Sequence, residues 1–262
     1  MAMLRNLPDI TKETLLDWIN QIWKTGKLPQ QWKHSLVIPI PKPGKDKGAL
    51  SSYRPISLTS CTCKLMERMV LARIVWHLES TDAFHPAQTG FRPCLGTQES
   101  LALISADVIR NINPNRATIR TIVAIDVKKA FDSVPHASVI NEARRLGIVG
   151  RPLNFIKNFL EGRTFSVRCG SHDSEPRVNR VGVPQGSVLS PTLFNIAMAA
   201  LPHELAKIPN LGFTVYADDV SIWTKNDDIV RQQDSLQAGL DTIEAQLCRV
   251  KMQASPRKPT TP

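Results

Sequence analysis

Residues 213–223 have the sequence Phe213-Thr214-Val215-Tyr216-Ala217-Asp218-Asp219-Val220-Ser221-Ile222-Trp223. The segments on both sides of the two acids are rich in β-branched and aromatic side chains, which is typical of short strands. The sequence therefore predicts a β-hairpin with Asp218 and Asp219 at its tip. Taken alone, the two acids are also explained as an ordinary turn, because acidic residues are common in turns.

A second apolar segment supplies a third acid. Residues 119–127 are mostly apolar and β-branched, as in a buried strand, and Asp126 lies near the end of this segment. Asp126 by itself is also explained as a structural residue at a strand end. However, carboxylates beside apolar neighbours are costly, and acids that are brought together repel one another unless cations neutralise them. Because Mg²⁺ prefers hard oxygen ligands of this kind, the pattern favours a magnesium site.

The rest of the chain mixes amphipathic helices with short extended segments. Helices are expected from Thr11 to Gly26, from near Cys63 to Leu78, from near Thr97 to Ile112, from a cap at Ser133 to Gly147, from Ser190 to at least Leu201, and over Leu236–Val250. Extended segments are expected at Leu36–Pro41 and in a hairpin of Phe165–Cys169 with Val178–Val183. Because strands and helices do not alternate regularly, the pattern favours an α+β fold over a doubly wound one.

The composition limits the class of protein. The 262 residues carry a formal net charge of +10, which favours an anionic partner such as nucleic acid, although a surplus of charge for solubility explains it equally well. The five cysteines are irregularly spaced and predict neither a disulfide framework nor a zinc site. No apolar stretch approaches the roughly 20 residues of a membrane span, and the first residues lack a secretory signal. We therefore expect a nuclear or cytoplasmic protein that is not secreted and does not bind membranes.

Several segments of the sequence, in one consistent order, resemble the motifs of reverse transcriptases. Tyr216–Asp219 resembles the YxDD box, and Ala124–Asp132 resembles the first catalytic motif, in which Ala-Phe-Asp follows an Asp. Gly182–Pro191 resembles the G-x-P-Q-G-x-x-L-S-P signature. Tyr53–Leu58 and Gln88–Arg92 are similar to the fingers motifs of non-LTR retrotransposon polymerases of the LINE type.

The resemblance covers about Leu36–Trp223 and implies a right-hand polymerase fold of the α+β class. Residues 1–118 would form an N-terminal extension and the fingers, and residues 119–262 a palm whose antiparallel sheet packs on helices. An insertion at about 148–182 is expected to associate with the fingers, and the tail 252–262 to be disordered. The thumb is expected to be absent. A group II intron-type or telomerase-like polymerase is the alternative within the same class of enzymes.

The resemblance implies a metal-binding role for two of the acids. Asp126 and Asp218 would bind two Mg²⁺ ions, for which Mn²⁺ is expected to substitute, and these ions would stabilise the attacking and leaving oxygens of phosphoryl transfer. Asp219 belongs to the same box and is expected to be a catalytic residue that supports the site. Asp132 matches the family pattern too, yet a helix cap or a structural ion pair explains it better than metal binding.

The resemblance also implies a nucleotide-binding site. Phe131 would be the steric gate that excludes a ribose 2′-hydroxyl, with an ordinary core aromatic as the alternative. Gln185 and Gly186 would lie beside the incoming nucleotide, where a glycine permits close approach of the backbone. Arg54 would bind the triphosphate through a charge-assisted fork, with a surface cation as the alternative. Lys42 would assist from its loop.

Lys258 is the candidate general acid for the pyrophosphate leaving group. It follows the last predicted helix as the family lysine does, but Pro259-Thr260-Thr261-Pro262 stands where the family continues with a strand. The expected function is that of an RNA-directed DNA polymerase of a retrotransposon, whose partners are an RNA template, a DNA primer and deoxynucleoside triphosphates. The alternative is a catalytically inactive remnant that binds nucleic acid and lacks a thumb. The sequence leaves the oligomeric state open.

Overall fold

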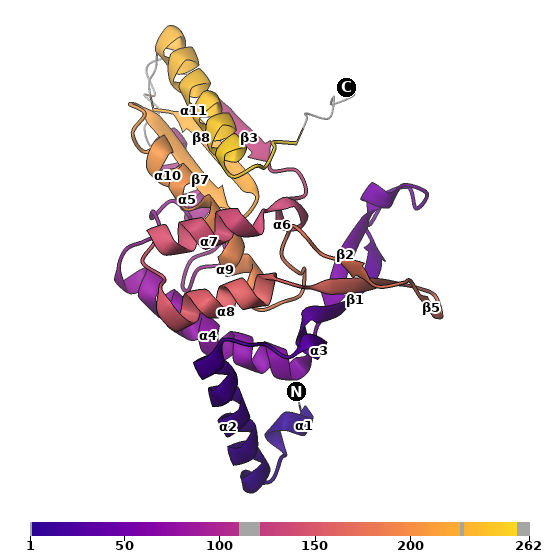
Figure 1. Cartoon of the computed structure of the whole chain (residues 1–262). Coiled ribbons are helices and arrows are strands. Elements are labelled where there is room, and N and C mark those ends of the chain that lie inside the picture. Colours follow the sequence, from indigo (N-terminus) through magenta and orange to yellow (C-terminus); the bar gives the residue numbers. More distant parts are fainter. Residues whose placement is uncertain (1, 110–120, 226–227, 256–262) are drawn as a thin grey trace.

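The computed structural model describes residues 2–109, 121–225 and 228–255. Its helices surround one three-stranded sheet and carry a second sheet at the side, which confirms the expected α+β class (Figure 1). In these three ranges no helix is long and apolar enough to cross a lipid bilayer.

The three-stranded sheet contains the predicted acidic hairpin. Its strands are antiparallel in the order β3 (Ile122–Asp126), β8 (Asp219–Thr224) and β7 (Leu211–Tyr216). Helix α11 (Ile229–Arg249) lies along one face of the sheet, where Gly239 comes close to apolar side chains of β7 and β8 (Figure 1). The hairpin and strand β3 are thus joined in one sheet that is packed against α11.

Helix α9 (Ser190–Met198) lies at the centre of the hydrophobic core. All of its residues except Pro191 are buried, including Leu193 and Phe194. Helices α7 (His136–Arg145), α8 (Gly150–Leu160) and α4 (Cys61–Ser80) contribute further residues to this core. The remaining helices are α1 (Ala2–Arg5), α2 (Asp9–Thr25), α3 (Gln30–Lys33), α5 (Thr97–Ile104), α6 (Ala130–Ser133), α10 (Ala200–Leu205) and the 3₁₀ turn Leu50–Ser52.

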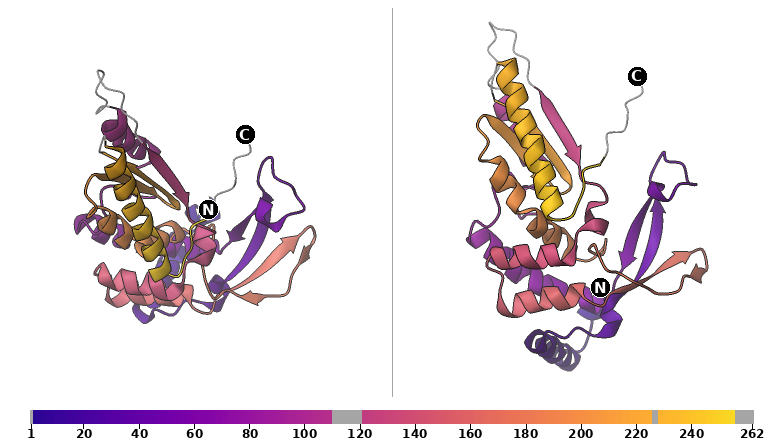
Figure 2. Two further views of the ribbon diagram at one scale, coloured as in Figure 1. Left: turned by 90° about the horizontal axis from the view of Figure 1, so that it is seen from above. Right: turned by 45° about the horizontal axis from the view of Figure 1, so that its top comes forward.

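The second sheet joins segments that are distant in sequence. Its strands are β1 (His34–Pro41), β2 (Tyr53–Leu58), β4 (Thr164–Cys169), β5 (His172–Asp173) and β6 (Arg177–Val178). Strand β1 pairs with β2 in antiparallel and with β4 in parallel orientation, while β5 and β6 pair with β4. Figures 1 and 2 show this sheet projecting from the helical body, so part of the segment 148–182 lies in the same sheet as β1 and β2.

Several helices differ from the predicted ones at their ends. Helix α2 ends at Gly26, whose φ of +69° suits glycine, but it begins before Thr11 because Pro8 already fixes a helix start. The prediction that Ser133 caps a long helix is wrong. Ser133 closes the short helix α6, and α7 begins after Pro135. Helix α5 continues as a π-helix over Ser105–Ile109, and Ile112 lies outside the described residues.

The beginning of the expected disordered tail is ordered. Met252 is buried, Ala254 forms a β-bridge with Val127, and the Ser255 amide donates to the Asp126 carbonyl at 2.7 Å. The expected disorder from residue 252 is therefore wrong for 252–255, and residues 256–262 lie outside the described residues.

Candidate active site

The three acids that the sequence singled out meet at one end of the three-stranded sheet. The register of β3 and β8 pairs Asp126 with Asp219, and the backbone amide of Val127 donates to the Asp218 carbonyl at 3.1 Å. Ala217 adopts a φ of +55°, which tightens the turn between β7 and β8. Residues that are about ninety positions apart in the chain are thus neighbours in space.

The charges of these acids act on one another. The pKa of Asp218 is raised above its ordinary range, first by burial and then by the negative charges of Asp219 and Asp126. Burial and the charge of Asp126 likewise raise the pKa of Asp219. A divalent cation bound here would relieve this repulsion, so the donor set fits a metal ion.

A metal ion at this end of the sheet would need ligands from outside the protein as well. Among the described residues, no three or more His, Cys, Asp or Glu side chains are grouped so that they could hold a metal ion by themselves. Mg²⁺ needs no such closed set, since it is usually held by one or two carboxylates and completes its shell with water and substrate phosphates.

Ser255 is a neighbour of Asp126 that the sequence analysis did not identify. Its hydroxyl donates to Oδ2 of Asp126 at 2.9 Å, while its amide donates to the Asp126 carbonyl. The segment around it also pairs with Lys128, whose amide donates to Gln253 at 2.9 Å. The chain after α11 therefore orients the carboxylate of Asp126. Lys258, the candidate general acid, lies outside the described residues.

The loop with Gln185 and Gly186 is fixed on both sides. The side-chain amide of Gln185 donates to Oδ1 of Asp132 at 2.9 Å. On the other side, the backbone amide of Ser57 donates to the backbone carbonyl of Gln185 at 2.6 Å. A Cβ atom on Gly186 would lie 2.5 Å from the Ser57 carbonyl oxygen, so the residue must be glycine. Asp132, for which a cap or an ion pair was expected, instead accepts this hydrogen bond. Burial raises the pKa of Asp132, and the bond from Gln185 opposes that rise.

Glu67 is a second residue that the sequence analysis missed. It comes from α4, is fully buried, and one of its oxygens accepts hydrogen bonds from the Ser187 hydroxyl and from the amides of Val188 and Leu189. The side chain thereby anchors the loop that follows Gly186. An acid on the apolar face of the predicted Cys63–Leu78 helix was the available signal, because an unpaired buried carboxylate is costly.

Residues 88–90 pair with strand β7 of the hairpin through their backbone, and we call this segment the clamp. Gln88 forms a parallel β-bridge with Val215, and the Thr89 amide donates to the Val215 carbonyl at 2.9 Å. A Cβ atom on Gly90 would lie 2.4 Å from the Ala217 nitrogen, so glycine permits this close approach. The Asn195 side chain, from α9, donates to the Gly90 carbonyl at 2.6 Å.

Phe131 links the core to this end of the sheet. Its ring is partly buried and lies 5.0 Å from the ring of Phe194, measured between centroids. On the other side it meets the ring of Phe91 at 6.1 Å. The residue therefore contacts a core ring and the ring of Phe91, which in turn lies beside Tyr216 of the hairpin. These contacts are compatible with the core alternative, and the gate role stays a prediction.

Arg54 and Lys42 lie in the second sheet and its loop. Arg54 is exposed on β2 and pairs with Ile40 of β1. It forms no ion pair with any other residue that the structure describes. Lys42 donates from its ammonium group to the Ser51 carbonyl at 3.0 Å. Arg54 is thus available to an anion, whereas Lys42 stabilises its own loop.

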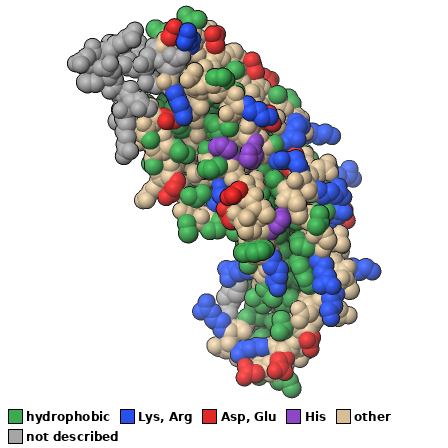
Figure 3. Space-filling view, turned by 90° about the vertical axis from the view of Figure 1, so that its left-hand side faces the viewer, with side chains coloured by type: hydrophobic (Ala, Val, Ile, Leu, Met, Phe, Trp, Pro, Cys, Tyr) green, Lys and Arg blue, Asp and Glu red, His purple; other side chains and the backbone are tan. Residues whose placement is uncertain are grey.

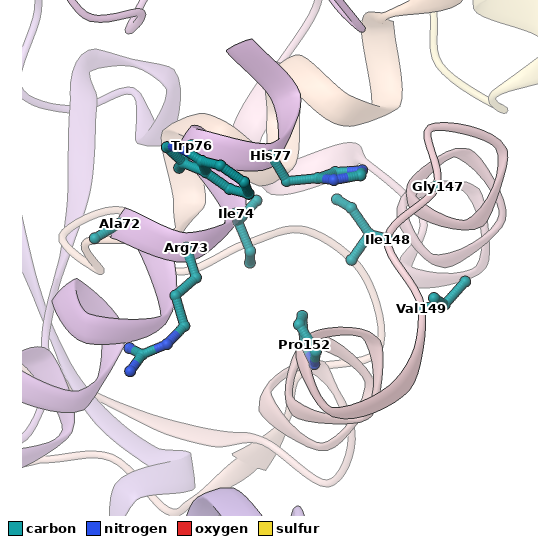
Figure 4. Close-up of a pocket in the computed structure, with 9 residues that line it drawn as sticks. All are labelled: Ala72, Arg73, Ile74, Trp76, His77, Gly147, Ile148, Val149 and Pro152. Atoms are coloured by element: carbon teal, nitrogen blue, oxygen red, sulfur yellow. The ribbon is translucent and has the colours of Figure 1, made fainter. Parts of the chain in front are cut away.

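A separate pocket lies away from the acids. It has a volume of about 690 Å³ and is formed by Arg73, Trp76 and His77 of α4 with Ile148 and Pro152 near the start of α8 (Figure 4). None of the predicted site residues lines it. On the face shown in Figure 3, Lys and Arg side chains line much of one edge, in keeping with the excess of basic residues.

Comparison with known proteins identifies relatives over most of the chain. Residues 40–261 match the protein-family model described as reverse transcriptase (RNA-dependent DNA polymerase). The chain is 35% identical over 246 residues to the RNA-directed DNA polymerase from mobile element jockey of Drosophila funebris, covering 92% of this chain and 26% of that protein. It is 32% identical over 247 residues to the probable RNA-directed DNA polymerase from transposon BS of Drosophila melanogaster, covering 93% and 27%. The chain thus spans about a quarter of the length of these curated relatives.

Solved structures share the fold at low sequence identity. Apo telomerase from Candida tropicalis, truncated from its C-terminal domain, matches with a TM-score of 0.61 and 14% identity, covering 92% of this chain and 55% of that one. Telomerase from Candida albicans, solved in complex with a fragment of telomeric RNA, matches with a TM-score of 0.60 and 13% identity, covering 96% and 46%. These matches support the predicted fingers and palm. The similar sequences, in contrast, come from retrotransposons.

Proposed function

The chain belongs to the reverse transcriptase (RNA-dependent DNA polymerase) family, and on this basis we propose that it forms the fingers and palm of an RNA-directed DNA polymerase of a non-LTR retrotransposon. The reaction would join a primer 3′-hydroxyl to the α-phosphorus of a deoxynucleoside triphosphate and release pyrophosphate. The observation that carries the proposal is the strand register that places Asp126 beside Asp219 and the turn with Asp218.

Asp126 and Asp218 are the proposed ligands of two Mg²⁺ ions. When bound, the ions would neutralise charge on the attacking and leaving oxygens, and Mn²⁺ would substitute for them. The carboxylates would hold the ions, Asp219 adds negative charge at the same end of the sheet, and Ser255 donates a hydrogen bond that orients Asp126. The protein then contributes positioning and charge neutralisation more than covalent chemistry.

The nucleotide would lie between the acids and the second sheet. Phe131 would exclude a ribose 2′-hydroxyl, and the loop of Gln185 and Gly186 would support the base and the template. Asp132 and Glu67 fix this loop through hydrogen bonds, so we assign them positioning roles. Arg54 would bind the triphosphate from β2.

Primer extension on an RNA template with Mg²⁺ tests the proposal. We expect metal-dependent extension by the chain, and a loss of more than about a hundredfold in Asp218→Ala, because bound metal ions contribute several kcal/mol of charge stabilisation. Asp17→Asn, an exposed acid on α2, is the control and should extend the primer normally. Binding of the RNA–DNA hybrid with no extension in any variant would contradict the polymerase and support a remnant that only binds nucleic acid.

A further inference from the structure

Phe91 has a backbone conformation that aromatic residues rarely adopt. Its φ is +56°, in the left-handed region, and 46% of its surface is exposed. A bulky residue in this region is strained, and such strain persists only where the surrounding structure imposes it. Burial of apolar surface does not explain the conformation, since almost half of the residue faces solvent.

The neighbours of Phe91 hold it in this conformation. Before it, Gly90 is packed against the backbone of Ala217 and bound by Asn195. After it, Arg92 donates to both carboxylate oxygens of Glu79, at 3.0 and 2.6 Å, and to the carbonyls of His85 and Gln88. One side of Phe91 is therefore tied to the acidic hairpin, and the other side is tied to α4.

The ring of Phe91 lies beside the proposed gate, Phe131, and beside Tyr216 of the acidic hairpin. It meets the ring of Phe131 edge to face, with centroids 6.1 Å apart and planes at 80°, and lies 6.3 Å from the ring of Tyr216. Aromatic pairs at this separation and angle attract one another beyond the area they bury. Phe131 therefore has two aromatic neighbours, Phe194 in the core and the partly exposed Phe91.

We propose that Phe91 is a positioning residue that holds the ring of Phe131 in place and so sets the discrimination between deoxynucleotides and ribonucleotides. The inference rests on the proposed function, in which Phe131 is the gate. Without the ring of Phe91, the ring of Phe131 loses one of its two aromatic contacts and can yield to a 2′-hydroxyl. The chemical group that Phe91 controls is therefore the 2′ position of the incoming sugar, although Phe91 itself need not touch it.

The test compares incorporation of one dGTP or one GTP opposite cytosine in an RNA template. Phe131→Ala should abolish most of the preference for dGTP. Phe91→Ala should lower the selectivity ratio, which is kcat/KM for dGTP divided by kcat/KM for GTP, by about two- to tenfold. This factor corresponds to the loss of one aromatic pair. The change should come mainly from a lower KM for GTP. The double variant Phe91→Ala/Phe131→Ala should be no less selective than Phe131→Ala alone. Once the ring of Phe131 is removed, Phe91 has no gate left to position.

Two controls separate positioning from a general structural effect. Phe91→Tyr keeps the ring and should keep the ratio, and Trp76→Ala, which removes a large exposed aromatic elsewhere, should leave it unchanged. A purely structural role of Phe91 would lower incorporation of dGTP and GTP equally. The equilibrium Kd values for dGTP and GTP with Mg²⁺ should also be measured on the same variants. They test the inference even if the chain does not extend primers.

The outcomes distinguish this inference from the function on which it rests. A reduced ratio in Phe131→Ala with a wild-type ratio in Phe91→Ala overturns the inference and leaves the gate intact. An unchanged ratio in Phe131→Ala overturns the gate assignment and the inference together. If the chain does not extend primers, equal Kd ratios in wild type and Phe91→Ala overturn the inference.

Discussion

At the scale of one residue, the ionised carboxylate of Asp218 lowers the stability of the folded protein. Burial and the charges of Asp219 and Asp126 raise its pKa. An acid whose pKa is higher in the folded protein favours folding while it is protonated, and this contribution is lost as the pH rises through the folded value. At neutral pH, without divalent ions, the ionised group therefore costs stability.

We predict that Asp218→Asn is more stable than wild type at neutral pH in the presence of EDTA. The gain should shrink as the pH falls toward and below the ordinary range of aspartate, where Asp218 is protonated in both folded and unfolded chains. Added Mg²⁺ should stabilise wild type more than the variant, since ligands that bind only the folded state shift its unfolding. Urea unfolding at several pH values measures both effects, and a variant that is less stable at neutral pH would contradict the prediction.

The residues of the site differ in how far the sequence could reveal them. The positions of Asp126 and Asp218 were predictable, because each acid follows an apolar, strand-like segment and belongs to a known motif. The roles of Glu67, Phe91 and Ser255 were not, since they depend on partners from other segments. Glu67, for example, is defined by the amides of Val188 and Leu189, more than a hundred residues away.

At the scale of elements, local patterns predicted the strands and non-local contacts decided their partners. The hairpin β7–β8 follows from its β-branched and aromatic side chains and from its acidic turn, and its prediction is confirmed. The parallel pairing of β1 with β4 joins His34 to Thr164, a contact that no local pattern encodes. Likewise, Met252 to Ser255 are ordered because they meet the end of β3, although their own sequence favours no fold.

The contact between the segment 88–90 and the hairpin gives a prediction at this scale. Gly90→Ala places a Cβ atom 2.4 Å from the Ala217 nitrogen, so the turn that carries the acids must shift. We expect the free energy of unfolding to fall by about 1–3 kcal/mol, as for other overpacked positions, and primer extension to fall with it.

Gly48→Ala is the matched control for this substitution. Gly48 does not need a left-handed φ, and a Cβ atom there would meet only the side chain of Asp46, at 3.4 Å. Its effect on stability should stay within about 0.5 kcal/mol. Denaturant unfolding of both variants makes the comparison, and equal behaviour of Gly90→Ala and Gly48→Ala would show that the clamp does not position the hairpin.

At the scale of the whole molecule, the charge balance bears on how the chain would hold a template and primer. The sequence has 33 Lys and Arg against 23 Asp and Glu, and the proposed partner carries a charge at every phosphate. Binding that neutralises phosphates releases counterions. The logarithm of the binding constant for an RNA–DNA hybrid should therefore fall linearly with the logarithm of the salt concentration, and we call the gradient of this line the salt slope. The second sheet projects from the body and carries exposed Lys45 and Lys47 in the loop between β1 and β2 (Figure 2).

If this loop contacts the backbone of the hybrid, replacing both lysines by glutamine should reduce the salt slope by about two, one for each phosphate contact that is lost. The matched control replaces Lys12 and Lys24 on α2, which lies at the bottom of Figure 1 whereas the tip of the loop lies at the right, and should leave the slope unchanged. Fluorescence anisotropy at a series of KCl concentrations without Mg²⁺ measures the slope independently of catalysis. Equal slopes for wild type and the loop variant would exclude the loop from the nucleic-acid interface, and the charge that holds the template would then have to come from other basic residues of the chain.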